Sequence, residues 1–233
     1  MAKQLTKEER EKMEQDPLIN FYTTVAAYFT KYRQMILGIG GAAILIIALS
    51  IGYYYYSKSQ EKEAQQLLFT AEELYRQGNY EKALTGDDRT FSAGFETVVD
   101  NYSGTDAANL ALYYAAVCEF NLNNPEQAYA YIKDHEPADG ILGVGPVSFH
   151  AVVLNELERY QEAADQFEIA AEWNINESTT PFNLMEAADA HHKSGNNKRA
   201  MKLAERVLEE YPDSPVATDA RRLKGMLMMA IGK

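Results

Sequence analysis

The sequence contains a single cysteine, Cys118, among its 233 residues. One thiol cannot form an intrachain disulfide, and it cannot supply a CxxC redox motif or a cysteine-based zinc site. We expect Cys118 to be a small buried residue of a helix, because thiols are among the most buried side chains. The chain also lacks the GxSxG, HExxH and Walker signatures of enzymes. The sequence therefore predicts a protein that is not an enzyme and that uses no cofactor, metal or small-molecule substrate.

Charge is missing from one stretch and unbalanced in another. Residues 35–56 include no Asp, Glu, Lys or Arg, whereas residues 57–233 hold 16 Lys and Arg against 29 Asp and Glu. The formal net charge of −12 thus comes from the part of the chain after the uncharged run. A surface this acidic repels nucleic-acid phosphates and anionic lipid headgroups. We therefore expect protein partners and no nucleic acid.

The uncharged run Met35–Tyr56 predicts a transmembrane helix. At 1.5 Å per residue it would span about 33 Å, which matches a hydrocarbon core of roughly 30 Å. Lys31 and Arg33 precede the run and Lys58 follows it, while four tyrosines at 53–56 suit the membrane interface. A cleaved signal peptide would have a shorter leader, a shorter apolar region and an A-x-A site. We therefore expect a permanent single-pass anchor.

Small residues recur in this run at a spacing of four, as Gly38 with Ala42 and Ala48 with Gly52. Such pairs let a second helix approach closely within a membrane. Short apolar helices also contain them by chance, so docking of a partner helix at these four residues remains one hypothesis beside a plain anchor.

An amphipathic helix is predicted immediately before the anchor. Asp16-Pro17 is suited to its start, with a capping residue followed by a proline at the first helical position. Apolar side chains then recur at spacings of three and four: Leu18, Phe21, Val25, Tyr28, Phe29 and Tyr32. Either this helix lies in the membrane interface or on a membrane partner, or it simply extends the anchor.

The region after the anchor contains a repeated pattern. Each of four segments contains turn residues followed by an alanine, and a second alanine lies 12 residues before the first one. The later alanines are Ala83, Ala128, Ala163 and Ala200, and the earlier ones are Ala71, Ala116, Ala151 and Ala188. This is the tetratricopeptide repeat pattern, in which small residues let the first helix of each repeat approach the second. We predict an all-α chain with a tail at 1–33, a transmembrane helix at 34–56 and a tetratricopeptide-repeat solenoid at 57–233.

Two linkers interrupt the predicted repeats. About eight residues are inserted in the first unit, and the polar stretch at 85–90 is the expected place. The glycine-rich stretch at 139–146 has neither the preceding strand nor the Lys-Ser/Thr of a phosphate-binding loop, so we interpret it as a hinge between repeats.

Three smaller features complete the predictions. Thr105 and Ser214 lie at matching offsets and indicate hydroxyl-capped helix starts. His191 and His192 are expected to cover an exposed helix end, because the nearby DxxH pair lacks a third metal ligand. The segment at 216–231, with Leu223 and Met226 at helical spacing, is expected to cover the open end of the stack.

Candidate binding residues follow from the repeat geometry. Solenoids of this class present an extended concave surface lined by the first helices. The aromatic and polar side chains expected there are Tyr75, Tyr113, Tyr114, Phe120, His150 and Asn155.

The order of short tail, single anchor and acidic repeat domain resembles the YfgM-like proteins of bacterial envelopes, as do the stretches 78–83 and 102–111. The resemblance implies a noncatalytic, ancillary subunit of the SecYEG translocon, which works with a PpiD-like chaperone and exported chains. It also implies the bacterial inner membrane, with a cytoplasmic N-terminus and a periplasmic repeat domain, a choice that the balanced flanking charges do not decide. As a departure, this tail is longer and carries Phe21, Tyr28, Phe29 and Tyr32 near the membrane, where that family often has tryptophans. The alternative function is an assembly factor for outer-membrane or cell-wall machinery.

Overall fold

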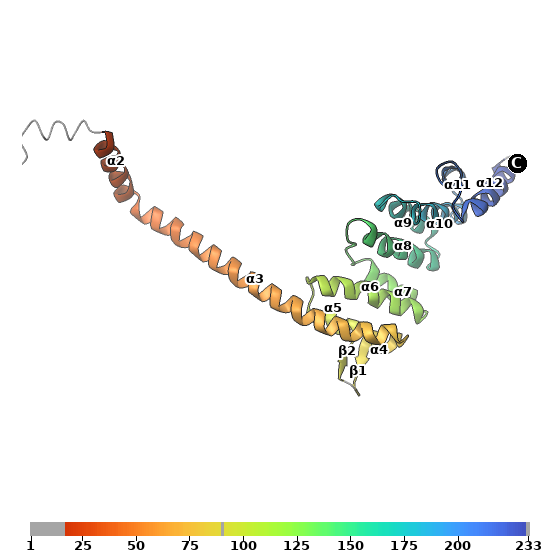
Figure 1. Ribbon diagram of the computed structural model, residues 1–233, viewed down its shortest axis with the longest axis horizontal. Coiled ribbons are helices and arrows are strands. Elements are labelled where there is room, and N and C mark those ends of the chain that lie inside the picture. Colours follow the sequence, from red (N-terminus) through yellow and green to blue (C-terminus); the bar gives the residue numbers. More distant parts are fainter. Residues whose placement is uncertain (1–16, 90, 232–233) are drawn as a thin grey trace, which may run out of the picture. The chain divides into compact units, whose positions relative to one another are not determined.

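The computed structural model describes residues 17–89 and 91–231 (Figure 1). The chain divides into two compact units, Met1–Lys58 and Ser59–Lys233. The first 16 residues of the tail predicted at 1–33 lie outside the described residues. Helix α3 runs without interruption through the boundary between the two units.

The first unit contains the apolar segment. Helix α2 (Pro17–Lys31) begins at the proline, as its sequence predicts, and α3 (Arg33–Arg76) follows after Tyr32. Among the described residues, α3 is the one helix long and apolar enough to cross a membrane. Its most apolar 18-residue window has a mean hydropathy of 2.4 and buries none of its residues against other parts of the protein. This helix is compatible with a single-pass membrane anchor.

The second unit is a tetratricopeptide-like solenoid of helices (Figure 1). Its first helices are the end of α3, α6, α8 and α10, and each is followed by a second helix or helix pair. The elements after α3 are α4 (Tyr80–Thr85), β1 (Gly86–Asp87), β2 (Ser92–Ala93), α5 (Phe95–Asn101), α6 (Asp106–Asn121), α7 (Pro125–Ile132), α8 (Ile141–Glu156), α9 (Tyr160–Trp173), α10 (Thr180–Lys193), α11 (Asn197–Glu210) and α12 (Ala217–Ile231).

Buried alanines hold the first and second helices together. All eight alanines of the repeat pattern, from Ala71 to Ala200, are fully buried. A methyl side chain allows two helix backbones to approach more closely than a larger residue would, and close packing makes any added volume costly. The buried side chains form one hydrophobic cluster across α3 to α6 and another across α8 to α12. The alanine spacing therefore predicted the helix pairing correctly.

The insertion expected at 85–90 is a small β-hairpin, which the all-α prediction did not include. Strands β1 and β2 pair antiparallel through Gly86 with Ala93 and Asp87 with Ser92. Gly86 has a φ of 99°, which other residues rarely adopt. A Cβ on Gly94 would lie 2.2 Å from the carbonyl oxygen of Leu84. The hairpin depends on these backbone contacts and separates α4 from α5.

The hinge predicted at 139–146 is wrong, because α8 already begins at Ile141. The helix start packs closely: the indole N–H of Trp173 donates to the carbonyl oxygen of Ala138 over 3.1 Å. A Cβ on Gly143 would lie 1.9 Å from that oxygen and 2.4 Å from Trp173 Nε1. Close packing, rather than flexibility, thus requires this glycine.

Gly143→Ala is expected to destabilise the repeat domain by about 1–3 kcal/mol, since the methyl group overpacks the start of α8. Gly145→Ala is the matched control, because a Cβ there meets nothing within 4 Å. Alanine is the better helix former, so the control is expected to gain about 0.5–1 kcal/mol. Urea unfolding of the full chain in detergent, followed by circular dichroism, measures both. Equal effects of the two substitutions would contradict the close packing at Gly143.

The two expected hydroxyl caps differ in the structure. Thr105 Oγ1 accepts a hydrogen bond from the backbone N–H of Ala108 over 3.1 Å at the start of α6, as predicted. In contrast, α12 begins three residues after Ser214, whose Oγ has no hydrogen-bond partner among the described residues. Leu223 on α12 is buried as expected, but Met226 is exposed.

His191 is buried, which corrects the prediction that it covers an exposed helix end. Its Nε2 lies 2.8 Å from Oε1 of Glu168 on α9, and the same carboxylate pairs with Arg199 on α11. One carboxylate therefore joins three helices. The hydrogen bond from Arg199 and, to a smaller extent, that from His191 hold the pKa of Glu168 below its ordinary value, against the opposing effect of burial.

Glu168→Gln is expected to destabilise the domain at pH 7 by about 1.5–3 kcal/mol, the usual contribution of hydrogen bonds to a charged group. Because the folded-state pKa of Glu168 is lowered, its stabilising effect is complete above the unfolded-state pKa and is lost as the pH falls through the folded-state value. The difference between wild type and variant should therefore shrink below about pH 4. Unfolding free energies at several pH values test this, with the exposed Glu209→Gln as control. A difference independent of pH would contradict it.

Candidate protein-binding surface

Three aromatic rings join α6 to α8. Tyr113 and Phe120 lie two helical turns apart on α6, and Phe149 of α8 contacts both. Its ring centroid lies 5.8 Å from that of Tyr113 and 5.5 Å from that of Phe120, and both contacts are edge-to-face. This geometry is a favourable one for aromatic pairs. All three rings are half-buried, so each keeps part of its surface available.

Polar contacts join α8 to α10. Ser148 Oγ donates to Asn183 Oδ1 over 2.7 Å, and Lys193 Nζ lies 3.4 Å from Asn155 Oδ1. Val152 lies one helical turn from Phe149, which contacts α6, and one turn from Ser148 and Asn155, which contact α10. It is therefore located between these two sets of contacts. Its side chain remains 37% exposed. We call the surface formed by Tyr113, Phe120, Phe149, Val152 and Asn155 the first-helix face.

The five residues of the first-helix face carry no charge, and the ammonium of Lys193 contacts the face at Asn155, although the repeat region as a whole is strongly acidic. Among Asp, Glu, Lys and Arg, helix α8 contains one residue, Glu156, which is its last. The second helix α9 carries four carboxylates. An apolar surface with a few hydrogen-bonding groups and a charged surround is typical of protein–protein contact sites.

Two other predicted binding residues, Tyr75 and Tyr114, are partly buried and pack against the first hydrophobic cluster. Tyr114 stacks on the fully buried Phe95 with ring centroids 5.2 Å apart, and Tyr75 lies 5.2 Å from Tyr114. Burial raises the pKa of both phenols, as it does that of Tyr113. Tyr75 also lies 5.7 Å from Tyr80 of α4, and Tyr114 lies 5.7 Å from Tyr113 of the first-helix face, so that both tyrosines continue the aromatic surface toward α4 and α5.

His150 lies against α7, the second helix of the preceding repeat. Its ring centroid is 5.7 Å from that of Tyr129, and the guanidinium of Arg159 lies 4.4 Å from the centre of the same tyrosine ring. Desolvation, and then the positive charge of Arg159, lower the pKa of His150. Its Nε2 has no hydrogen-bond partner in the described part of the chain. The structure thus separates His150 from the aromatic rings with which the sequence grouped it.

Phe149 and Val152 are members of the face that the sequence interpretation missed. A signal for Phe149 was present: it lies two residues before Ala151, as Tyr114 lies two residues before Ala116. Aligning the four repeats on their earlier alanines would have placed an aromatic residue at this position in three of them. Val152 carried no such signal, because its exposure follows only from the packing of its neighbours.

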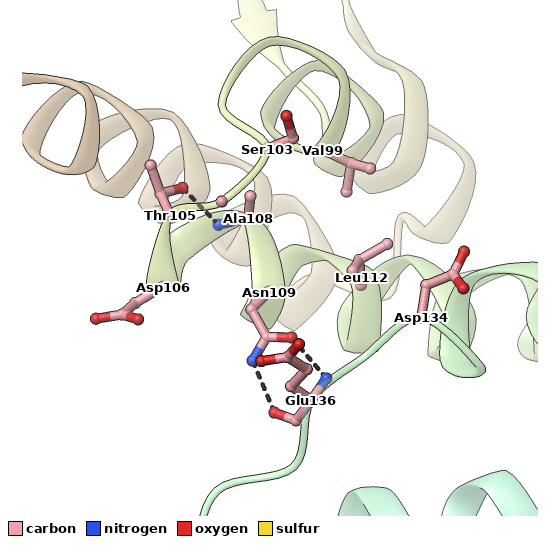
Figure 2. A pocket seen from close by; sticks show the side chains of 10 residues that line it. Val99, Ser103, Thr105, Asp106, Ala108, Asn109, Leu112, Asp134 and Glu136 are labelled. Carbon is pink, nitrogen blue, oxygen red and sulfur yellow. Dashed lines mark hydrogen bonds between the residues drawn. The ribbon is translucent and has the colours of Figure 1, made fainter. Parts of the chain in front are cut away.

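A cavity of about 260 Å³ lies beside the start of α6 (Figure 2). Asn109 closes one side, with its amide donating to the carbonyl oxygen of Glu136 and accepting from the Glu136 backbone N–H, both over 2.8 Å. The α6 N-terminus, a potential anion site, is already occupied by the carboxylate of Glu61, which accepts from the N–H groups of Asp106 and Ala107. We interpret this cavity as a polar junction between repeats.

The described residues offer little for metal or thiol chemistry. Within residues 17–89 and 91–231, no group of three or more His, Cys, Asp or Glu side chains is placed to hold a metal ion. Cys118 is fully buried, as predicted, and burial raises its pKa to about 12. A thiol with this pKa carries almost no thiolate at neutral pH, which makes it a poor nucleophile.

The four small residues of the predicted helix-docking site, Gly38, Ala42, Ala48 and Gly52, are all exposed on α3. A Cβ added to either glycine would meet nothing within 4 Å. The surface is therefore open to another helix, and the docking hypothesis stays a prediction.

Known proteins resemble the second unit. The family model described as "Tetratricopeptide repeat" matches residues 183–214, which contain most of α10 and all of α11. The chain contains a tetratricopeptide repeat. A crystal structure of the nearly identical TPR-like repeats of a putative kinesin light chain from Podosopora anserina is similar at 14% identity, with a TM-score of 0.52. The alignment covers 74% of this chain and 88% of that chain.

The same values hold for a second crystal structure of those kinesin light chain repeats. No curated protein matches the chain. The structural likeness establishes the fold, and the repeats indicate a protein-interaction scaffold, because stacked helical repeats present extended surfaces that bind other proteins.

Proposed function

We propose that this protein is a noncatalytic, membrane-anchored scaffold that binds protein segments on the first-helix face. The observation that supports this best is the aromatic group of Tyr113, Phe120 and Phe149, which is partly exposed and whose side chains carry no charge. Binding energy at protein interfaces concentrates in a few partly buried aromatic anchors. Their edge-to-face packing fixes the rings in advance, so that little side-chain entropy is lost when a partner binds.

The chemistry of the surface favours one kind of ligand. Val152 and the three aromatic rings suit apolar side chains, whereas Asn155 offers an amide for hydrogen bonds to a peptide backbone. The surrounding carboxylates of the acidic domain attract cationic residues and repel acidic ones. We infer that the bound segment is apolar and is flanked by Lys or Arg.

The resemblance to YfgM-like proteins supports a proposal for the position of the scaffold. We propose that α3 spans a bacterial inner membrane, with the N-terminus in the cytoplasm and the repeat domain in the periplasm. The segments bound would be those of exported chains, and the neighbours would be SecYEG and a PpiD-like chaperone. The order of tail, anchor and acidic repeats supports this proposal. Alkaline phosphatase and fluorescent-protein fusions at the C-terminus test the orientation, and fluorescence without phosphatase activity would contradict it.

Copurification of the full chain under mild detergent tests the proposed partners. We expect translocon subunits, a periplasmic chaperone and exported chains to be enriched. Enrichment of outer-membrane or cell-wall assembly proteins would instead support the alternative function of an assembly factor. A chain with Tyr113→Ala and Phe149→Ala is the control, because it keeps the anchor and loses the aromatic contact. Partners retained equally by this variant do not bind the first-helix face.

A further inference from the structure

Helix α2 carries a broad apolar stripe of exposed side chains. Phe21, Tyr22, Val25, Tyr28 and Phe29 lie at spacings of three and four, and all are exposed. Exposed apolar surface of this size on one helix marks a site of contact with a membrane or a partner. Helix α2 belongs to the first compact unit, Met1–Lys58, together with the apolar run of α3.

The opposite side of α2 is polar without being charged. Asn20, Thr23 and Thr30 lie there, and the helix has no ionisable residue before Lys31 other than its tyrosines. The hydroxyl of Thr30 donates to the carbonyl oxygen of Ala26 over 2.8 Å, as Ser50 does to Ile46 within α3. Thr30 thus satisfies its own donor within the helix, which lowers the cost of leaving bulk water.

Chain continuity places α2 beside the anchor. Only Tyr32 separates α2 from α3, and the hydrogen bonds from Tyr32 N to Tyr28 O and from Ile36 N to Tyr32 O continue through the junction. The uncharged run of α3 begins three residues after Tyr32. If α3 spans a bilayer, the end of α2 is held within about one helical turn of the lipid surface. The tether to α3 then gives α2 a very high effective concentration of lipid surface, so that weak affinity for lipid is enough for binding.

Charge favours lipid over an acidic protein surface or a second acidic repeat domain. The described residues of the first unit, 17–58, contain Lys31, Arg33 and Lys58 and no Asp or Glu. Cations beside an amphipathic helix attract anionic headgroups, while aromatic side chains prefer the boundary between headgroups and acyl chains.

We propose that α2 is a lipid-binding helix, which lies in the membrane interface with its aromatic stripe in the acyl boundary. This inference rests on the proposed anchor in α3 and adds a second membrane contact, on the N-terminal side of the span. Two contacts would restrict the tilt and rotation of α3, since interfacial aromatic and cationic residues anchor a spanning helix.

Single cysteines with an environment-sensitive fluorophore test this in the full chain, reconstituted into vesicles of phosphatidylcholine and phosphatidylglycerol. Cys118 should not react, because it is buried and its pKa is raised to about 12, and the unsubstituted chain measures any residual labelling. Val25→Cys lies at the centre of the stripe, and Ala27→Cys lies two residues away on the opposite side. Ile46→Cys, within the apolar run of α3, reports the anchor separately.

A lipid spin-labelled near the headgroup is expected to quench most of the emission at position 25, while aqueous iodide quenches position 27. Equal quenching of positions 25 and 27, by the lipid label or by iodide, would overturn the inference. Protection of position 25 from both quenchers would also overturn it, because it would indicate that a protein partner or a second copy covers the stripe. Each of these outcomes leaves the anchor intact if a second lipid, spin-labelled deep in its acyl chain, quenches position 46, which lies about 15 Å from either end of the apolar run. Absence of quenching at position 46 by the acyl-chain label would instead overturn the proposed membrane anchor.

Discussion

Replacing Phe95 with alanine is expected to lower the free energy of unfolding of the repeat domain by about 3–5 kcal/mol. Phe95 is fully buried at the start of α5, where its ring stacks on Tyr114 of α6 and lies 6.4 Å from Tyr75 of α3. The substitution removes the buried ring and leaves a cavity between three helices. It also removes an aromatic pair that contributes about 0.5–1.5 kcal/mol beyond its buried area.

Phe69→Ala is the control for this prediction. Phe69 is on α3 and is 64% exposed, and its contact is with the guanidinium of Arg76 at 5.8 Å from the ring centre. An exposed contact of this kind contributes about 0.5–1 kcal/mol. Urea unfolding of both full-length variants in detergent measures the two effects. A similar loss for the two phenylalanines would show that Phe95 does not hold the first repeat together.

Replacing Tyr113 and Phe149 together with alanine is expected to weaken binding of a captured partner at least about 30-fold, the loss that corresponds to 2 kcal/mol for a typical hot spot. The two rings contact each other across α6 and α8, so a single substitution leaves the second ring able to move into the gap. The rings are half-buried, and the double variant should therefore still fold.

Ile169→Ala provides the matched surface control. Ile169 is on the second helix α9 and is 47% exposed, outside the first-helix face. Titration of the partner identified by copurification gives the dissociation constants of wild type and both variants, and circular dichroism checks folding. Unchanged affinity in a folded double variant would exclude the aromatic group as the binding site.

The repeated helix pairs were predictable because their signal is local and periodic. An alanine at each helix crossing recurs at nearly constant spacing, and all eight such alanines are buried. The apolar run of α3 was also predictable, because 22 consecutive residues without charge are a local signal. No comparable period marks the hairpin, whose two-residue strands depend on Gly86 and Gly94 meeting backbone carbonyls.

Side-chain partners distant in the sequence account for the features that prediction missed. His191 is polar and lies near a helix end, yet it is buried because Glu168, 23 residues earlier, satisfies its Nε2. The start of α8 packs closely because Gly143 leaves room for the carbonyl of Ala138 and for Trp173 of the next helix. In the candidate site, Tyr113 and Phe120 were named from sequence, whereas Phe149 lies between them only through the packing of α8 on α6.

Site-specific photocrosslinking in living cells tests the central claim most directly. A photoreactive amino acid at Val152, in the middle of the first-helix face, should crosslink to exported chains or to translocon and chaperone subunits. The same group at Ile169, on α9, should give little of these products. Equal crosslinking from the two positions, or crosslinking from Ile169 alone, would contradict the proposal that the first-helix face is the binding surface.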